Sequence, residues 1–225
     1  MPRRMTSIMA NSSKKSPLQH HFVNLNQQYD ASQLGMWAFL ITEILFFGAL
    51  FTGYTIYRML YPTAFGIASG HLDITLGAIN TAVLIASSLT MALAVHAGHT
   101  GNPKKIIKFL LLTILLGSVF LGIKAVEYSH KFHEHLVPGP HFGFPLYTGP
   151  GSELFFSFYF AMTGLHAFHM VVGIIGLFIL VWMAHKGKFT EEYSTPVEMM
   201  GLYWHFVDIV WIFLFPLLYL VMRHH

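Results

Sequence analysis

Five long apolar runs dominate this 225-residue sequence and restrict the folds open to it. They cover approximately residues 34–57, 72–97, 106–126, 154–184 and 200–222. Each run approaches or exceeds the ~20 residues that a helix needs to cross the hydrocarbon core of a bilayer. The runs are continuously apolar rather than alternating, which favours helices over the strands of a β-barrel. The sequence therefore predicts an all-α membrane protein, a bundle of five transmembrane helices.

The composition agrees with a membrane protein and excludes several other classes. Charged residues make up 10% of the chain, whereas a soluble domain carries about 25%. The chain has no cysteine, which excludes disulfides, thiolate metal sites and iron–sulfur clusters. The formal net charge of +3 is too small and too dispersed to indicate a nucleic-acid partner.

The charge pattern predicts how the chain is organised across the membrane. We expect a polar cytoplasmic tail at residues 1–33 and a transmembrane domain at residues 34–225. The basic, acid-poor first 16 residues also fit a mitochondrial presequence, but no cleavage signal or amphipathic periodicity follows them.

The side of the amino terminus collects Arg3, Arg4, Lys14, Lys15, Lys104, Lys105, Lys108, Lys186 and Lys188. The opposite side collects Arg58, Lys124, Lys131 and Arg223. Because positive loops face the cytoplasm, we expect a cytoplasmic amino terminus and a periplasmic carboxy terminus.

Glu43 stands inside the first apolar run, in the segment LITEILFFGALF. A charge at the bilayer centre costs roughly 2.5–3.5 kcal/mol even on lenient scales. The carboxyl group is therefore expected to be protonated, or to pair with a donor on a neighbouring helix. A proton carrier would need a series of titratable groups across the membrane, and none is evident. We favour a hydrogen bond between helices.

Two histidines in the segment TGLHAFHM are the leading candidates to meet Glu43. His166 and His169 are three residues apart, so they share a helix face. They could ligate haem or a metal, but a haem core needs several histidines on separate spans. The other histidines in the runs fall near the expected span ends: His96, His185 and His205. We therefore expect a structural hydrogen bond, preferably Glu43 with His169 and alternatively Glu43 with His166.

The second run contains hydroxyl and amide side chains that predict a packing seam. Such small polar residues let membrane helices approach closely. They are Thr75, Asn80, Thr81, Ser87 and Ser88.

The last run opens with the segment EMMGLYWHFVDIVW. Tyr203, Trp204 and Trp211 suit a membrane interface. Asp208 is a second intramembrane carboxylate, expected to lie shallower than Glu43 and toward the cytoplasmic side. It could hydrogen-bond a partner subunit, a lipid headgroup or a neighbouring indole N–H.

The expected third loop, EYSHKFHEHLVPGPHFGFPLYTGPGSE, holds Glu127 and several histidines. His130, His133 and His135 are weak candidates for a zinc or copper site, because their spacing matches no specific ligand pattern. A solvated cap with proline and glycine turns explains the segment better. We therefore expect no metal and no catalytic residue in this chain.

Five segments resemble, in the same order, the helices of subunit III of haem–copper oxidases. They are LITEILFFG, AINTAVLIASSLTMALAVHAGH, LGSVFLGIKAVEY, TGLHAFHMVVG and YWHFVDIVWIFLF, and the resemblance covers about residues 30–222. The family's membrane carboxylate maps onto Glu43, its histidine pair onto His166 and His169, and its last-helix acid onto Asp208. The other matching residues are Tyr203, Trp204, His205, Phe206, Trp211, Glu127 and Glu198.

The resemblance implies a subunit of cytochrome c oxidase without redox centres, in a complex that reduces oxygen to water and translocates protons. Haem and copper are expected in partner subunits. The chain itself is expected to bind the side of subunit I, to support proton uptake and oxygen access, and to bind phospholipid. Longer relatives have seven spans, so this is the five-helix form familiar in bacteria, which places it in a bacterial inner membrane. A small helical subunit, or a larger respiratory supercomplex, could supply the missing helices.

Other functions remain open at this point. Within the same family, the chain could serve a quinol oxidase or a nitric oxide reductase. An autonomous transporter is disfavoured because the spans show no repeats or broken helices. A haem- or metal-binding membrane protein is the other distant alternative.

Overall fold

A computed structural model describes residues 18–140, 142–144, 150–190 and 193–220. Its helices are α1 (Leu25–Leu60), α2 (Pro62–Ser69), α3 (Ile74–His99), α4 (Pro103–His133), α5 (Pro150–His185) and α6 (Thr195–Tyr219). All of these helices except α2 are long and apolar enough to cross a membrane. The prediction of an all-α bundle with five membrane helices is confirmed.

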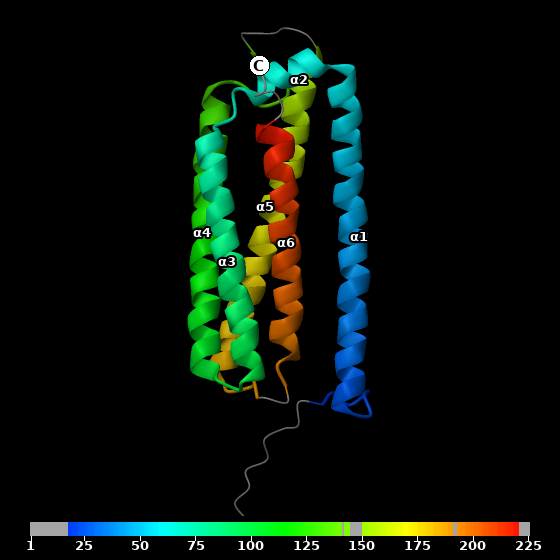
Figure 1. Cartoon of the computed structure of the whole chain (residues 1–225), viewed down its shortest axis with the longest axis vertical. Coiled ribbons are helices and arrows are strands. Elements are labelled where there is room, and N and C mark those ends of the chain that lie inside the picture. Colours follow the sequence, from blue (N-terminus) through cyan, green and yellow to red (C-terminus); the bar gives the residue numbers. More distant parts are fainter. Residues whose placement is uncertain (1–17, 141, 145–149, 191–192, 221–225) are drawn as a thin grey trace, which may run out of the picture.

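The five long helices stand side by side and alternate in direction (Figure 1). The start of α1 and the end of α6 consequently lie at opposite ends of the bundle. α3 packs mainly against α4 and α6, whereas α1 lies at one side and contacts α5 and α6. The short helix α2 packs against α5 beside the end of α1.

Several helices extend beyond the apolar runs that revealed them. α1 begins at Leu25 rather than near Leu34, because the Asn24 side chain caps it by accepting from Gln27 N at 2.8 Å. α4 continues to His133, seven residues past the expected end at Val126, and α6 begins at Thr195 rather than Met200. Hydropathy detects only the part of a helix that lies in hydrocarbon, and these helices continue into polar sequence.

α6 is the most buried of the five helices and α1 is the least. The expectation that Tyr203, Trp204 and Trp211 anchor the chain at a membrane interface is wrong, because all three are buried in the bundle. Trp204 Nε1 donates to Ser87 Oγ and Trp211 Nε1 donates to Thr81 Oγ1, each at 3.0 Å. Thr81 and Ser87 thus lie in the predicted seam with indoles of α6 as partners, whereas the buried Asn80 amide has no hydrogen-bond partner among the described residues.

Glycines create the space for the Trp204 indole. A Cβ atom added to Gly117 on α4 or to Gly173 on α5 would lie 2.9 Å from an indole carbon of Trp204. The ring therefore rests against the backbones of two helices. Small residues serve this purpose in membrane bundles, where close packing replaces the hydrophobic effect as the force between helices.

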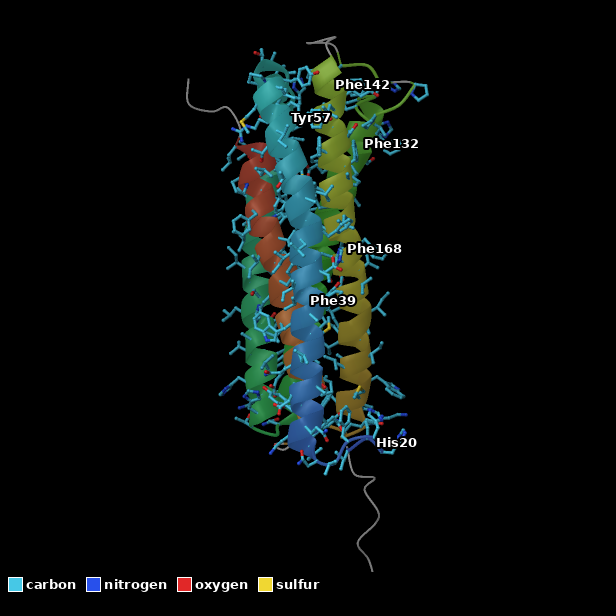
Figure 2. All side chains as sticks on the ribbon, turned by 90° about the vertical axis from the view of Figure 1, so that its right-hand side faces the viewer. His20, Phe39, Tyr57, Phe132, Phe142 and Phe168 are labelled. Atoms are coloured by element: carbon cyan, nitrogen blue, oxygen red, sulfur yellow. The ribbon has the colours of Figure 1, made fainter. Side chains whose placement is uncertain are left out.

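The outer surface of the bundle is apolar along its length. Figure 2 shows Phe39 and Tyr57 on α1 and Phe168 on α5 at the surface of the bundle. Their exposed fractions are 38%, 39% and 63%. In water such a surface would be unfavourable, and in hydrocarbon it costs nothing.

Substitution of Gly117 by alanine tests the contact with Trp204. We expect Gly117→Ala to destabilise the chain by about 1–3 kcal/mol, because the indole is fully buried and has no room to move. Gly122→Ala on the same helix is the matched control, since nothing lies within 4 Å of its added Cβ. Thermal unfolding of the purified chain in detergent measures both. Equal midpoints for the two variants would contradict the packing described.

Candidate functional site

Glu43 of α1 and His169 of α5 meet near the middle of their helices. His169 Nε2 lies 3.1 Å from Glu43 Oε2, and His169 Nδ1 lies 2.9 Å from Leu165 O. The predicted pair of Glu43 with His169 is confirmed. His169 is buried, and the Glu43 side chain is 19% exposed.

The hydrogen-bond geometry assigns one proton of this pair. A carbonyl oxygen only accepts, so His169 Nδ1 carries a proton and donates it to Leu165 O. Nε2 then either accepts a hydrogen bond from a protonated Glu43 or, as imidazolium, donates one to the carboxylate. The pair has no net charge in either arrangement, which is what a low-dielectric environment requires.

Polar contacts hold α1 at three depths, although this helix buries little apolar surface. Near its start, Tyr29 OH donates to Glu198 Oε2 at 3.1 Å. Near its end, Tyr54 OH donates to Leu217 O at 2.8 Å. The contact of Glu43 lies between these two. α1 is therefore attached to α5 and α6 by hydrogen bonds at three depths, in addition to the packing of the buried Phe47 and Tyr54 rings.

His166 does not take part in the contact with Glu43, so the alternative pairing is wrong. Its ring is buried beside Phe120 and Trp211, with ring centroids 5.4 Å and 5.3 Å away. Neither ring nitrogen has a hydrogen-bond partner among the described residues. The two histidines share a helix face but have different surroundings, and they do not converge on one site.

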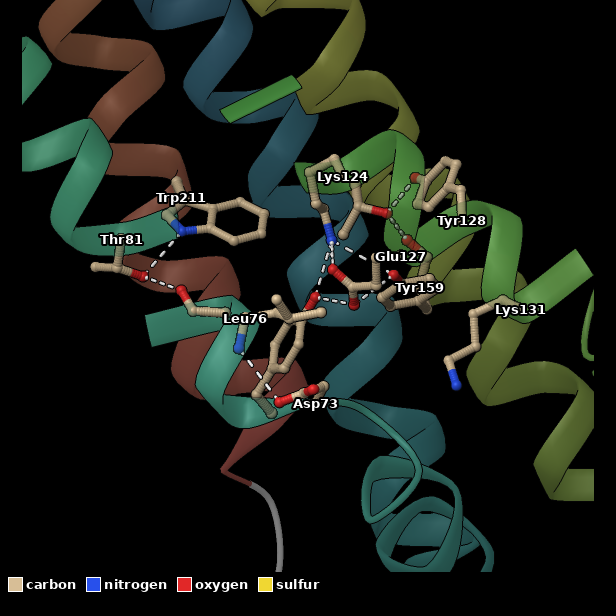
Figure 3. A network of polar contacts seen from close by, with 12 residues as sticks. Asp73, Leu76, Thr81, Lys124, Glu127, Tyr128, Lys131, Tyr159 and Trp211 are labelled. Carbon is tan, nitrogen blue, oxygen red and sulfur yellow. Dashed lines mark hydrogen bonds and ion pairs between the residues drawn. The ribbon is translucent and has the colours of Figure 1, made fainter. Parts of the chain in front are cut away.

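A buried ion pair on α4 is the main feature that the sequence interpretation missed. Lys124 Nζ lies 2.9 Å from Glu127 Oε2, and both side chains are almost completely buried (Figure 3). Tyr159 OH donates to Glu127 Oε1 at 2.8 Å, and Tyr219 OH donates to the same oxygen. Lys124 Nζ also donates to Tyr219 OH at 2.8 Å. The carboxylate thereby receives donors from α4, α5 and α6.

Lys124 was expected near the end of a span and Glu127 in the loop that follows it. Both expectations were wrong, because α4 continues to His133. The three-residue spacing of Lys124 and Glu127 on a helix was the available signal. A second pair lies farther along α4, where Lys131 Nζ is 2.6 Å from Glu134 Oε2 and donates to His71 O at 3.0 Å. That pair connects α4 to the turn before α3.

Asp208 and His205 lie well inside α6. Asp208 is near the middle of α6, about 20 Å from Thr195 and about 17 Å from Tyr219 at 1.5 Å per residue. Because α6 begins at Thr195 rather than Met200, both residues lie farther from the start of the helix than the apolar run indicated, and their depth in a bilayer stays a prediction. His205 Nδ1 lies 2.8 Å from Ser88 Oγ. The expected bond from an indole to Asp208 is absent among the described residues.

Glu198 organises a polar pocket of about 300 Å³ near the start of α1. Its Oε1 lies 3.0 Å from His99 Nε2 and accepts from Ser194 Oγ at 2.6 Å, while its Oε2 accepts from Tyr29. Tyr193, in the loop before α6, also lines the pocket, and burial raises the pKa of its phenol. The carboxylate thus joins α1, α3 and α6 at this end of the bundle.

His130, His133 and His135 are exposed near the end of α4. His130 and His133 lie on the helix, and His135 follows it with a φ of 54°. Within the described part of the chain, no three His, Cys, Asp or Glu side chains are grouped so that they could hold a metal ion.

Comparisons with known proteins point to subunits of oxidases. The chain matches the family model described as cytochrome c oxidase subunit III over residues 13–222. It is 34% identical over 189 residues to quinol oxidase subunit 3 of Bacillus subtilis, which covers 84% of this chain and 86% of the relative. It is 33% identical over 224 residues to cytochrome c oxidase subunit 3 of Corynebacterium diphtheriae, covering 96% and 100%. Cytochrome bo(3) ubiquinol oxidase subunit 3 of Pseudomonas aeruginosa is 30% identical, with 83% of each chain covered.

Two substitutions at Glu43 separate hydrogen bonding from packing. Glu43→Gln retains a side chain that can hydrogen-bond to His169 Nε2, so we expect a thermal midpoint close to that of the native chain. Glu43→Leu leaves the buried imidazole unpaired, and we expect a loss of about 1–3 kcal/mol. Thermal unfolding in detergent measures the difference. Equal stability of both variants would refute the role given to this contact.

A double substitution tests the ion pair on α4. We expect Lys124→Met to cost about 3–5 kcal/mol, because it leaves the Glu127 carboxylate buried without its cation. Adding Glu127→Gln should restore much of this loss, since the amide oxygen can still accept from Tyr159 and Tyr219. Unfolding midpoints of the two single variants and the double variant provide the comparison. Simply additive losses would argue against a coupled pair.

Proposed function

The chain belongs to the cytochrome c oxidase subunit III family, and we propose that it is the non-catalytic third subunit of a proton-pumping haem–copper terminal oxidase in a bacterial inner membrane. The observation that carries this proposal is the uninterrupted family match over residues 13–222, which takes in all five membrane helices. The curated relatives named above come from bacterial oxidases.

In this role the polar residues of the bundle join helices, and the chemistry of oxygen reduction belongs to haem and copper in a partner subunit. The separate surroundings of the histidines inside the bundle support this division, since His166 lies among aromatic rings without a hydrogen-bond partner in the described part of the chain. His169 is bonded on both ring nitrogens, and His205 is bonded to Ser88. A haem site would need such imidazoles to converge on one cavity.

We propose that the end of the bundle where α1 begins faces the cytoplasm. Lys104, Lys105 and Lys108 lie at the start of α4, and Lys186 and Lys188 follow α5, at this end. The opposite end holds Arg58 in the last turn of α1, while Lys124 and Lys131 are buried and ion-paired within the bundle and contribute little to the charge of the loops. Arg3, Arg4, Lys14, Lys15 and Arg223 lie outside the described residues. The positive-inside rule then favours a cytoplasmic amino terminus.

The subunit is proposed to stabilise subunit I and to support its proton uptake and oxygen supply, with phospholipid on its outer surface. The apolar exterior supports the contact with lipid, since exposed leucine, isoleucine and phenylalanine side chains run along α1 and α5. The weakly buried α1 leaves a surface on which a small helical subunit can pack. Family membership and the apolar exterior of the bundle support these proposed roles.

Gentle solubilisation followed by identification of the co-purifying chains tests the proposal. We expect recovery with a large haem-bearing subunit, a Soret band from the complex and none from the separated chain. Oxidation of reduced cytochrome c or of quinol by the complex then identifies the electron donor. A Soret band from the separated chain would contradict the proposal, as would a stable homo-oligomer without other subunits. A complex that reduces nitric oxide but not oxygen would also contradict it.

A further inference from the structure

A groove between α3 and α6 opens on the outer surface of the bundle, where the two helices lie side by side (Figure 1). Its volume is about 460 Å³, within the range of about 300–1,000 Å³ that small-molecule sites occupy. Most of its lining is apolar, and the exposed members are Ile85, Leu89, Ile209 and Ile212. The polar lining side chains are Thr81, Ser88, His205, Asp208 and Trp211.

One polar side-chain atom of this lining is open to a ligand. Thr81 Oγ1 accepts from Trp211 Nε1, and Ser88 Oγ lies 2.8 Å from His205 Nδ1. The carboxyl oxygens of Asp208 are enclosed by the bundle. His205 is half-buried, and its Nε2 has no hydrogen-bond partner among the described residues and is not one of the enclosed polar atoms. The apolar groove therefore presents one free imidazole nitrogen.

His205 differs in this respect from the two histidines of α5. Both ring nitrogens of His169 are engaged, and both ring nitrogens of His166 are enclosed among aromatic side chains. Of these three histidines, only His205 can offer a nitrogen to a molecule outside the chain.

The position of His205 along α6 limits what that molecule can be. The residue lies about 15 Å from Thr195 and about 21 Å from Tyr219 at 1.5 Å per residue, and half of a hydrocarbon core is about 15 Å thick. We therefore expect the imidazole to lie within hydrocarbon. Lipid headgroups remain in the interfacial layer, and acyl chains form no hydrogen bond with an imidazole. The ligand must be a lipid-soluble molecule that carries a hydrogen-bonding group into the hydrocarbon.

The hydrogen bond between His205 and Ser88 lets Nε2 meet either an acceptor or a donor. With the imidazole proton on Nε2, the ring donates to a carbonyl oxygen while Nδ1 accepts from the Ser88 hydroxyl. With the proton on Nδ1, the ring donates to Ser88 Oγ and Nε2 accepts from a hydroxyl group. Quinones are lipid-soluble molecules whose ring oxygens are carbonyls in the oxidised form and hydroxyls in the reduced form. The pair of His205 and Ser88 suits both forms.

We propose that the α3–α6 groove binds the ring of an isoprenoid quinone from the lipid phase, with His205 Nε2 hydrogen-bonded to a ring oxygen. Ile85, Leu89 and Ile212 supply the apolar contacts with the ring, and the isoprenoid tail extends from the groove into the surrounding lipid. The quinone site goes beyond the proposed function, since it requires only that the bundle spans a membrane.

Photolabelling of the purified complex in lipid nanodiscs tests the site. The probe is an azido-substituted benzoquinone with a decyl tail, and labelled peptides of this chain are identified by mass spectrometry. We expect label on the segments of α3 and α6 that line the groove, removed by an excess of unmodified decylbenzoquinone. Label that the excess does not remove, or label spread equally over α1 and α5, would overturn the site. Label that enters the groove only after the chain is separated from its partners would do the same, because a partner helix would then be the occupant.

Substitution of His205 tests the hydrogen bond. We expect His205→Phe to weaken the binding of decylbenzoquinone by about tenfold, the effect of losing one buried hydrogen bond. His133→Phe is the matched control, because His133 is exposed near the end of α4 and does not line the groove. Competition against the photoreactive probe measures both affinities. Equal affinities in the two variants would overturn the assignment of His205. The label is read on peptides of this chain, so the result does not depend on the identity of the complex.

A variant at the rim of the groove tests the site without removing a hydrogen bond. Leu89 is exposed and lines the groove, so in Leu89→Trp the larger side chain should occupy the space of the quinone ring and remove the specific label. Phe178→Trp on the outer face of α5 is the control and should leave the label unchanged. Full specific labelling of Leu89→Trp would overturn the proposed site.

Discussion

Many polar groups inside the bundle have their hydrogen-bond partner on another helix, and α6 is the helix on which most of these partners meet. Trp204 and Trp211 donate to α3, Tyr203 donates to the backbone of α5, and Tyr219 donates to Glu127 on α4. Lipid provides no hydrophobic force between helices, so such contacts and close packing determine the arrangement. The central position of α6 thus depends on the indole N–H and phenol O–H groups of these side chains as much as on its apolar side chains.

The position of α1 also depends on polar contacts with other helices. It lies at the side of the bundle and buries little of its surface, so packing alone is a weak attachment. Glu43 supplies the contact at mid-depth, while Tyr29 and Tyr54 supply the contacts near the ends. In the proposed oxidase subunit, these three bonds and the packing of Phe47 and Tyr54 together set the position of a helix that has lipid or another subunit on its outer side. The carboxyl group of Glu43 thus has a positioning role.

Hydropathy and spacing predicted the helices and one important contact. The apolar runs located all five spans, and the shared face of His166 and His169 reduced the partners of Glu43 to two. Helical spacing gave no physical reason to choose between the two histidines as the partner of Glu43, because that choice depends on the rotation of α5 relative to α1. The burial of Trp204 was missed for a related reason, since an aromatic residue near the expected end of a span fits an interface equally well.

The remaining wrong predictions concern residues near the expected ends of the helices. An apolar run ends where the hydrocarbon ends, but α4 continues through Glu127 and α6 begins before Met200. Residues assigned to loops or shallow positions were therefore buried, and the ion pair of Lys124 with Glu127 went unrecognised. The groove beside Asp208 depends on how α3 and α6 pack, which hydropathy does not contain.

The distance between α1 and α5 is the most direct test of the claim that buried hydrogen bonds position the helices. The chain has no cysteine, so spin labels can be attached to cysteines introduced at Leu45 and Phe178, which both face outward. Pulsed electron–electron double resonance in lipid nanodiscs then measures the distribution of distances between the two labels, with and without Glu43→Leu. The account predicts a narrow distribution that becomes broader when the carboxyl group is removed. An identical narrow distribution in both samples would contradict it, because α1 would then be positioned by packing alone.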